Sequence, residues 1–240
     1  MANGYSTKLG SVSYPVSFRK LFILTTHYSR RTPVRHDQVP ALRSERSRIR
    51  QDSGRDLCAA GIQARRPLNN AGTGANLVQA GAKTAQGFEA MVGMHCVATL
   101  LFTQLLLPQL RAAASRTSAS VRVVWTSSFL AEAASPANGI DFDRLETGTT
   151  DRTHDYAVSK VGTWMLDREL ARRYGKDGIV SVIQNPGNLK AGSYAGTPTV
   201  AMFFIRPLLY EAKFGAYTEL YAGLSPDITL ESNNGAYVIP

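Results

Sequence analysis

The 240-residue sequence contains little cysteine, and its histidines are scattered. Cys58 and Cys96 are its two cysteines, and they form neither a disulfide framework nor a pair with the spacing of metal ligands. The four histidines form no cluster in the sequence: they are His27, His36, His95 and His154. The composition therefore predicts a protein of a reducing compartment that has no metal site.

Two motifs of well-known enzyme classes are also missing. Neither Ser127 nor Ser128 lies in a G-x-S-x-G sequence, which argues against a serine hydrolase. Gly72-Thr73-Gly74 opens a loop of small residues, but Leu77 occupies the place of the third glycine in G-x-G-x-x-G. As a phosphate-binding signal this loop is weak.

Acidic residues are scarce in the first part of the chain. Residues 1–66 hold 13 lysines and arginines against four acidic residues, which accounts for the whole net charge of +9, and residues 67–240 are neutral. The first segment has one apolar run, Leu21–Leu24, and no sustained period of 2 or 3.6. We therefore predict a basic, poorly structured segment at 1–66 and a folded domain at 67–240.

Three interpretations of residues 1–66 remain open. The segment is Arg- and Ser-rich, as in a mitochondrial targeting peptide, which would be cleaved within about the first 30–60 residues. It could instead be a disordered arm that binds polyanions, or a misread stretch of gene. Arginines without interleaved aromatics make nucleic acid the weakest partner, and we expect none. The expected location is cytoplasmic, or mitochondrial if the segment is a targeting peptide.

From Leu68 onward, strand and helix patterns alternate. Apolar β-branched runs predict strands at 121–125, 178–183 and 237–239, and helical periodicity predicts helices at 86–110, 153–174 with Thr153 as cap, and 200–223 interrupted at Pro207. Residues 129–153 form a long connection. This alternation predicts an α/β fold, a Rossmann-like parallel sheet with helices on both faces.

The predicted helix at 86–110 is apolar enough to raise a membrane span. Polar residues and a proline interrupt it, namely His95, Gln104, Pro108 and Gln109. We therefore expect no membrane span, but a helix buried in the core or in a subunit interface.

One stretch, Tyr156-Ala157-Val158-Ser159-Lys160, carries the strongest chemical signal. Residues four apart on a helix share a face, with Cβ atoms about 5–6 Å apart. An ammonium so close favours a phenolate, so we expect the pKa of Tyr156 to fall below its ordinary value of about 10. Tyr156 is then a candidate general acid and base.

Four motifs occur in the order and approximate spacing of the short-chain dehydrogenase/reductase family: Asn69-Asn70-Ala71-Gly72, Ser127-Ser128 after a strand, Tyr156-x-x-x-Lys160, and Pro186-Gly187. The chain resembles that family over about residues 68–240. Residues 172–178, 185–190 and 215–220 look like its fungal branch, several members of which act in secondary-metabolite pathways.

The resemblance implies a role for each matching residue. Tyr156 would exchange a proton with the substrate oxygen while hydride passes to or from nicotinamide, and Lys160 would lower the pKa of Tyr156 and bind the nicotinamide ribose. Ser128, rather than Ser127, would orient the substrate oxygen. The remaining implied cofactor contacts are Asn70 and Gly72 on the adenosine side and Pro186, Gly187 and Leu189 beside the nicotinamide.

Three departures from the family pattern matter, the first being Ala191, which stands where the family commonly has a threonine that binds the cofactor carboxamide. His95 stands where the family usually has an asparagine that holds a relay water, which makes His95 a further catalytic candidate or a buried histidine with a local backbone partner. The family's glycine-rich turn is not found in residues 1–66. We therefore expect the first strands to be missing or disordered and the domain to be truncated at both ends.

The resemblance implies an NADP-dependent oxidoreductase, with NAD as an alternative cofactor. It would interconvert a carbonyl and a secondary alcohol of a small hydrophobic molecule. Without the glycine-rich turn, the 240-residue chain is expected to bind the cofactor weakly or not at all. The alternatives are an inactive relative that serves as an interaction subunit, and a partial fold behind a transit peptide. Homo-oligomerisation would use the helices at 86–110 and 154–174.

Overall fold

The computed structural model describes residues 65–116, 121–194 and 197–240. The predicted poorly structured segment at 1–66 therefore lies almost wholly outside the described residues and stays a prediction. The same holds for the expectation that the first strands are missing or disordered.

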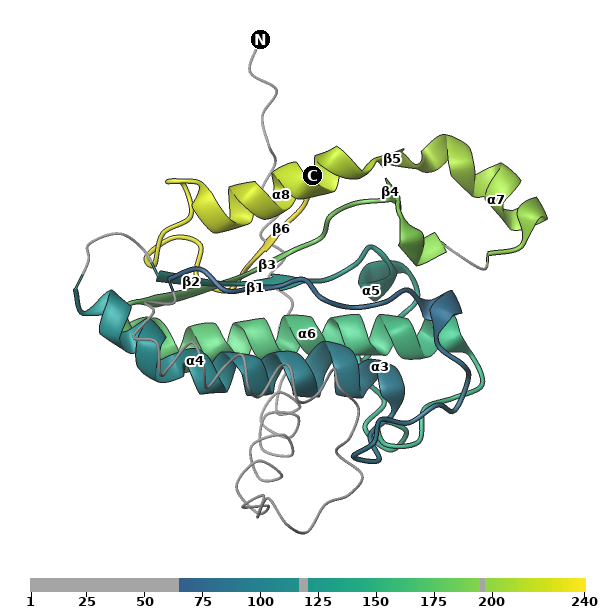
Figure 1. Ribbon diagram of the computed structural model, residues 1–240, viewed down its shortest axis with the longest axis horizontal. Coiled ribbons are helices and arrows are strands. Elements are labelled where there is room, and N and C mark those ends of the chain that lie inside the picture. Colours follow the sequence, from purple (N-terminus) through teal and green to yellow (C-terminus); the bar gives the residue numbers. More distant parts are fainter. Residues whose placement is uncertain (1–64, 117–120, 195–196) are drawn as a thin grey trace.

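A parallel four-stranded sheet forms the centre of the described chain (Figure 1). Its strands are β1 (Leu68–Asn69), β2 (Val121–Thr126), β3 (Ile179–Gln184) and β6 (Ala236–Val238), hydrogen-bonded in that order. Every residue of β2 and β3 is buried, as their continuous apolar and β-branched runs predict. The three predicted strands are confirmed, each with its bounds shifted by one residue at one or both ends.

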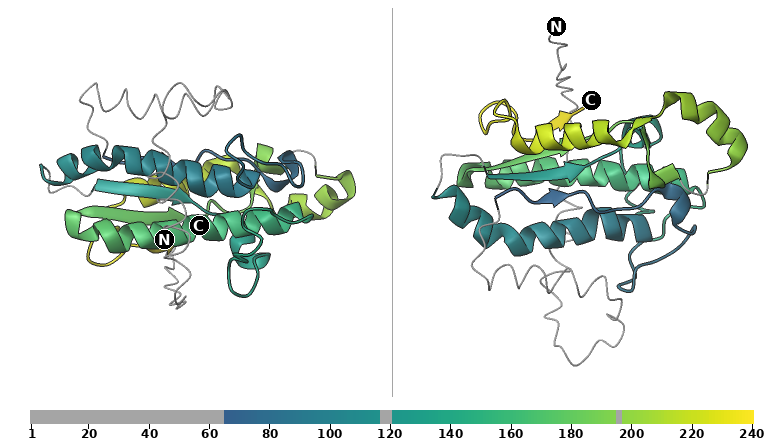
Figure 2. Two further views of the ribbon diagram at one scale, coloured as in Figure 1. Left: turned by 90° about the horizontal axis from the view of Figure 1, so that it is seen from below. Right: turned by 45° about the horizontal axis from the view of Figure 1, so that its top comes forward.

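Helices cover both faces of this sheet. Helices α4 (Ala98–Ala114) and α6 (Arg152–Tyr174) lie on one face, and α8 (Ala212–Leu224) lies on the other (Figures 1 and 2). The larger core cluster joins α4, α6 and the facing side chains of β2 and β3, and a smaller one lies under α8. The predicted Rossmann-like parallel sheet with helices on both faces is confirmed.

The helix predicted at 86–110 begins later and ends later than expected. Helix α3 (Ala90–Val92), a π-helical segment (Gly93–Val97) and α4 run on without a break. The carboxylate of Glu89 fixes the start, because it accepts hydrogen bonds from the backbone N–H groups of Met91 and Val92 at 2.9 and 2.7 Å.

By length and composition alone, Ala90–Ala114 could cross a membrane. In the fold, however, this helical run contacts α6 and the sheet, and 56% of its most apolar window is buried. That is the packing of a core helix, as the polar interruptions of the sequence predict.

The start of α6 differs from the prediction in its capping residue. Asp151, not Thr153, caps the helix, and its carboxylate accepts from the N–H groups of Thr153 and His154 at 2.8 and 3.2 Å. At the other end, Glu169 pairs with Arg173 as predicted and also with Arg172. This carboxylate is buried rather than outside, with 4% of its side chain exposed.

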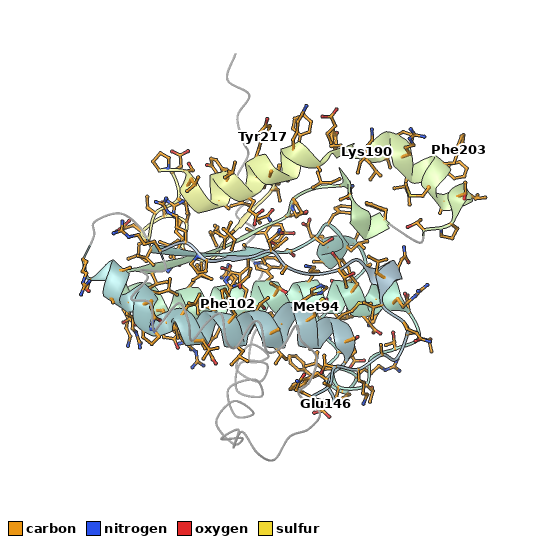
Figure 3. All side chains as sticks on the ribbon, in the orientation of Figure 1. Met94, Phe102, Glu146, Lys190, Phe203 and Tyr217 are labelled. Carbon is orange, nitrogen blue, oxygen red and sulfur yellow. The ribbon has the colours of Figure 1, made fainter. Side chains whose placement is uncertain are left out.

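Residues 188–211 form an excursion from the sheet. Strand β4 (Leu189–Lys190) pairs with β5 (Tyr210–Glu211), and α7 (Thr199–Ile205) lies between them. The predicted break near Pro207 is confirmed, but β5 forms within it. Helix α7 buries none of its residues, and Phe203 and Tyr217 project away from the body of the molecule (Figure 3).

Shorter helices complete the described chain. Helix α5 (Leu130–Ala133) lies within the long connection predicted after residue 129. Four 3-10 turns lie elsewhere in the described residues: Ala75–Leu77, Gly175–Asp177, Gly192–Tyr194 and Arg206–Leu208.

A buried arginine joins the sheet to α8. Arg122 points from β2 toward the end of that helix and donates to the carbonyl oxygens of Ala222, Ser225 and Ile228 at 3.2, 2.6 and 2.8 Å. The last carbonyls of a helix have no partner within it and carry partial negative charge, so a cation suits this place. Arg122 thereby fixes α8 over the sheet.

Helix α6 also buries a carboxyl group against the sheet. The hydroxyl of Ser181 donates to Asp167 Oδ1 at 2.7 Å and accepts from the indole N–H of Trp125 at 2.9 Å. Burial raises the pKa of Asp167 to about 8, although the Ser181 hydrogen bond opposes the shift. The group is therefore protonated at neutral pH.

This raised pKa predicts a pH-dependent stability. Because the folded chain holds the Asp167 proton up to about pH 8 and the unfolded chain loses it near pH 4, the free energy of unfolding should fall as pH rises between them. In Asp167→Asn, the total decrease in the free energy of unfolding across this pH range should be smaller by several kcal/mol, on the order of 1.4 kcal/mol per pH unit. Urea unfolding across this pH range measures it. The exposed Asp227→Asn is the control, and an equal slope in both variants would contradict the assignment.

Candidate active site

The predicted site residues gather at the carboxyl ends of β1, β2 and β3. Three loops leave the sheet there, at 70–74, 127–129 and 185–188, and the first turns of α6 lie beside them. In open parallel sheets this edge is where ligands bind.

Lys160 reaches this edge from α6. It is buried, and its ammonium donates to the backbone carbonyl of Thr126, the last residue of β2, at 3.2 Å. Its Nζ lies 5.5 Å from the ring centroid of Tyr156, one helical turn earlier. The hydroxyl of Ser128 lies close enough to the Tyr156 phenol to lower its pKa. The structure thus brings Ser128, Tyr156 and Lys160 together.

The expected direction of the Tyr156 pKa shift is wrong for this structure. Burial raises the pKa of Tyr156, and this outweighs the Ser128 hydrogen bond, which lowers it. The Lys160 ammonium hydrogen-bonds Thr126 rather than the phenol. Burial also lowers the pKa of Lys160 to about 8, so desolvation disfavours both charged forms.

The two neighbouring serines have different surroundings. Ser127 is buried, and its hydroxyl faces the backbone carbonyl of Lys160 at 3.5 Å. Ser128 is half-buried, accepts from the N–H of Leu130 at 3.3 Å and lowers the pKa of the nearby Tyr156 phenol. The geometry therefore places Ser128, the residue chosen from the sequence, beside the phenol.

His95 lies in the same cluster, on the π-helical segment. Its ring meets that of Tyr156 edge to face at 5.5 Å between centroids. Its Nδ1 lies 2.8 Å from Ser159 Oγ, and its Nε2 accepts from the backbone N–H of Thr73 at 3.3 Å. Hydroxyls of Thr99 and Thr163 donate to its backbone carbonyl. π-Helical turns of this kind often occur at functional sites.

Gly72 lies directly against His95. A Cβ atom at this glycine would come within 2.8 Å of His95 Nε2 and 3.9 Å of Lys160 Nζ. A side chain at position 72 would overlap Nε2, and the ring cannot easily move aside because it is buried. The absence of a side chain at position 72 is therefore what allows the loop after β1 to approach the cluster.

The other predicted cofactor residues lie around the same edge. Asn70 is exposed, and its Oδ1 accepts from Thr126 Oγ1 at 3.3 Å. After β3, Gly187 has a φ of +83° and donates its N–H to Asn185 Oδ1 at 3.0 Å. Leu189 and Pro186 contact Gly215 at the start of α8. Their roles as cofactor contacts stay predictions.

Three residues of the cluster were not singled out from the sequence. Ser159 links His95 to α6, Thr73 links His95 to the loop after β1, and Tyr194 raises the pKa of Tyr156 by its proximity. Ser159 could have been suspected, because a serine in a helix interior usually has a specific hydrogen bond. Thr73 contributes only its backbone, and Tyr194 lies far away in the sequence, so no local pattern marks them.

Comparison with known proteins identifies relatives of this chain. No protein-family model matches the chain. The short-chain dehydrogenase/reductase iacJ of Pestalotiopsis fici is 51% identical over 175 residues, which cover 72% of this chain and 52% of that protein. The short-chain dehydrogenase/reductase pkfC of Emericella nidulans is 41% identical, covering 72% of this chain and 55% of that protein. The chain spans about half the length of these curated relatives.

Solved structures show the same fold. An NADPH-bound carbonyl reductase from chicken fatty liver superposes with a TM-score of 0.53 at 18% identity, over 80% of this chain and 68% of that one. A 3-oxoacyl-[acyl-carrier protein] reductase from Brucella melitensis gives a TM-score of 0.52 at 22% identity, over 80% and 70%. At these identities the likeness concerns the fold alone.

The contact between Gly72 and His95 gives a packing prediction. Gly72→Ala should lower the free energy of unfolding by about 1–3 kcal/mol, because the new methyl group overlaps Nε2. In a His95→Ala background the same change should cost less than about 1 kcal/mol. Gly192→Ala, where no atom lies within 4 Å of a Cβ, is the control and should change stability by less than about 0.5 kcal/mol. Equal costs of Gly72→Ala in both backgrounds would show that the ring is not the obstacle.

Proposed function

The chain belongs to the short-chain dehydrogenase/reductase family, and it spans about half the length of two fungal members. We propose that its site serves an NADP-dependent oxidoreductase. The reaction would interconvert a carbonyl and a secondary alcohol of a small hydrophobic molecule. The observation that carries the proposal is the convergence of Ser128, Tyr156 and Lys160 at one end of β2.

The phenol of Tyr156 suits the role of proton donor to a substrate carbonyl. Its raised pKa keeps it protonated at neutral pH, so it can deliver a proton to an oxygen that gains negative charge. Ser128, whose hydroxyl lies near the phenol, can donate to the same oxygen once a substrate lies between them.

Lys160 supports the charge that Tyr156 is left with. When the phenol gives up its proton, the ammonium 5.5 Å from the ring centroid stabilises the phenolate, and low solvent access strengthens this attraction. The ammonium is itself held by Thr126, so it needs little rearrangement to act. The same three groups acting in reverse would oxidise an alcohol.

The part of the site next to Tyr156 fits a nicotinamide ring. When bound, the nicotinamide supplies or accepts the hydride. The Lys160 ammonium lies near the Gly72 backbone, within reach of a ribose bound at this edge of the sheet. Asn70, Pro186 and Leu189 lie around them. Solved relatives of the fold with NADPH bound favour the phosphorylated cofactor.

The adenosine and pyrophosphate end of the cofactor does not fit the described residues. Dinucleotides bind where the strand order of an open sheet reverses, beside a glycine-rich turn. Among the described strands the order β1-β2-β3-β6 runs in one direction only, with β1 at the edge. We therefore propose that strong cofactor binding needs further strands beside β1.

This mismatch also favours a second candidate function. A chain that cannot hold the dinucleotide would be an inactive relative that acts as an interaction subunit, with the helical runs at 86–110 and 154–174 as its proposed oligomer contacts. NADPH titration of the 240-residue chain tests this mismatch: tight binding would refute the need for further strands and would also exclude a chain that cannot hold the dinucleotide.

Two aromatic side chains, one on the loop after β2 and one near the phenol, support a small apolar substrate. Phe129, directly after Ser128, is 47% exposed, and Tyr194 lies near Tyr156. Aromatic and aliphatic neighbours around a few polar groups are typical of sites for small apolar molecules. The proposed place in fungal secondary metabolism rests on the resemblance to the fungal branch of the family.

The catalytic assignment is tested in a chimera that carries the amino-terminal part of the Pestalotiopsis fici relative ahead of Arg65. With NADPH and a panel of small apolar ketones, we expect turnover, seen as loss of NADPH absorbance. Tyr156→Phe should lower kcat by about 10²-fold or more, because the proton donor is lost. Tyr174→Phe, at the far end of α6, is the matched control and should leave kcat unchanged. Turnover that survives Tyr156→Phe would exclude this mechanism.

The lowered pKa of Lys160 predicts a pH profile. Since the ammonium loses its proton through about pH 8, kcat/KM for ketone reduction should fall as pH rises past that value. The exposed Lys176→Met should keep the same profile. A profile that is flat between pH 7 and 9 would contradict a role for the Lys160 charge.

A further inference from the structure

His95 connects three parts of the site that are distant in sequence. Its ring is buried, with 2% of the residue exposed. Through Thr73 it contacts the loop after β1, through Ser159 it contacts the middle of α6, and its edge meets the ring of Tyr156. Ser159 in turn donates to the backbone carbonyl of Tyr156 at 2.7 Å.

These partners fix the protonation of the ring. A backbone N–H can only donate, so His95 Nε2 must accept from Thr73 and carries no proton. In the neutral ring the proton is then on Nδ1, which donates to Ser159 Oγ, and the Ser159 hydroxyl passes its own hydrogen to the Tyr156 carbonyl. Every donor in this series meets an acceptor.

We propose that His95 is a positioning residue, whose Nδ1–H tautomer fastens the Gly72–Thr73 backbone to α6 beside Tyr156. The role rests on the proposed function, because that loop would contact the dinucleotide. Its Nε2 is engaged by Thr73, so the ring holds the loop rather than relaying a proton. The close approach of Gly72 to both His95 Nε2 and Lys160 Nζ follows from the same contact.

Protonation of His95 would release this contact. An imidazolium has no acceptor, so Nε2–H and the Thr73 N–H would be two donors facing each other. The titratable groups on the elements packed against this segment are Asp155, Tyr156 and Lys160 of α6 and Glu89 at the start of α3, with Cys96 beside the ring on its own segment. The Lys160 cation lies on the Gly72 side, where it opposes a second positive charge.

Two substitutions test the hydrogen bonds of the two ring nitrogens one at a time. In His95→Gln the side-chain oxygen can replace Nε2 as acceptor for Thr73, and it does not titrate. In His95→Asn the shorter amide can still donate to Ser159, as Nδ1 does, but it cannot reach Thr73. The pair thus keeps or removes the loop contact while both variants retain a polar amide.

The test is NMR on the full 240-residue chain, labelled with ¹⁵N, without cofactor. The ¹⁵N shifts of the four histidines, with His95 assigned by its absence in His95→Gln, should show the Nδ1–H tautomer at neutral pH. The hydrogen-exchange protection factor of the Thr73 amide should fall roughly three- to tenfold in wild type as His95 becomes protonated. It should stay high at all pH values in His95→Gln and low at all pH values in His95→Asn.

Three results would overturn the proposal. They are an Nε2–H tautomer in the wild type, wild-type Thr73 protection in His95→Asn, or the same pH dependence in His95→Gln as in the wild type. The wild-type titration alone decides the matter if either variant fails to fold. Because no readout involves cofactor or turnover, the result is independent of whether the oxidoreductase assays succeed.

Discussion

The hydrogen bond from the Lys160 ammonium to the Thr126 carbonyl is the interaction on which the rest of the site depends. It places a cation, buried at a cost in desolvation, against the carboxyl end of β2. This contact fixes the rotation of α6 relative to the sheet. Once that rotation is set, Tyr156 faces Ser128, and Ser159 faces His95. Thus, one helix face carries the phenol of Tyr156, the ammonium of Lys160 and the Ser159 hydroxyl that contacts His95.

The candidate site lies at one end of the sheet, next to the edge that β1 forms among the described strands. Strand β1 pairs only with β2 among the described strands, while α8 and α4 cover the two faces up to that edge. A parallel sheet gains its ligand crevice from strands on both sides of a reversal. In the proposed function, the residues that would handle a substrate oxygen are among those described, and a site for the dinucleotide phosphate is not.

Much of this could be predicted from the sequence, because its signals are local. Runs rich in β-branched residues at 121–125 and 178–183 predicted buried strands, and Tyr156 and Lys160, four residues apart on a helix, predicted a shared side. The sequence could not give the sign of the Tyr156 pKa shift. That sign depends on how much water the fold removes from both groups, and desolvation outweighs a cation that is engaged elsewhere. The cap of α6 was misplaced for a similar reason, since Asp151 and Thr153 are both good caps and only backbone geometry selects one.

By itself, the sequence determined the element types, the parallel sheet and the residues able to do the chemistry, because periodicity and residue type act over a few neighbours. Only the tertiary structure decided that the N–H of Thr73 occupies one nitrogen of His95 and Ser159 the other, and that no side chain fits at position 72. These are contacts between segments separated by more than 20 residues in sequence. They depend on the packing of α6, the π-helical segment and the β1 loop to within a fraction of an ångström, which no local pattern encodes.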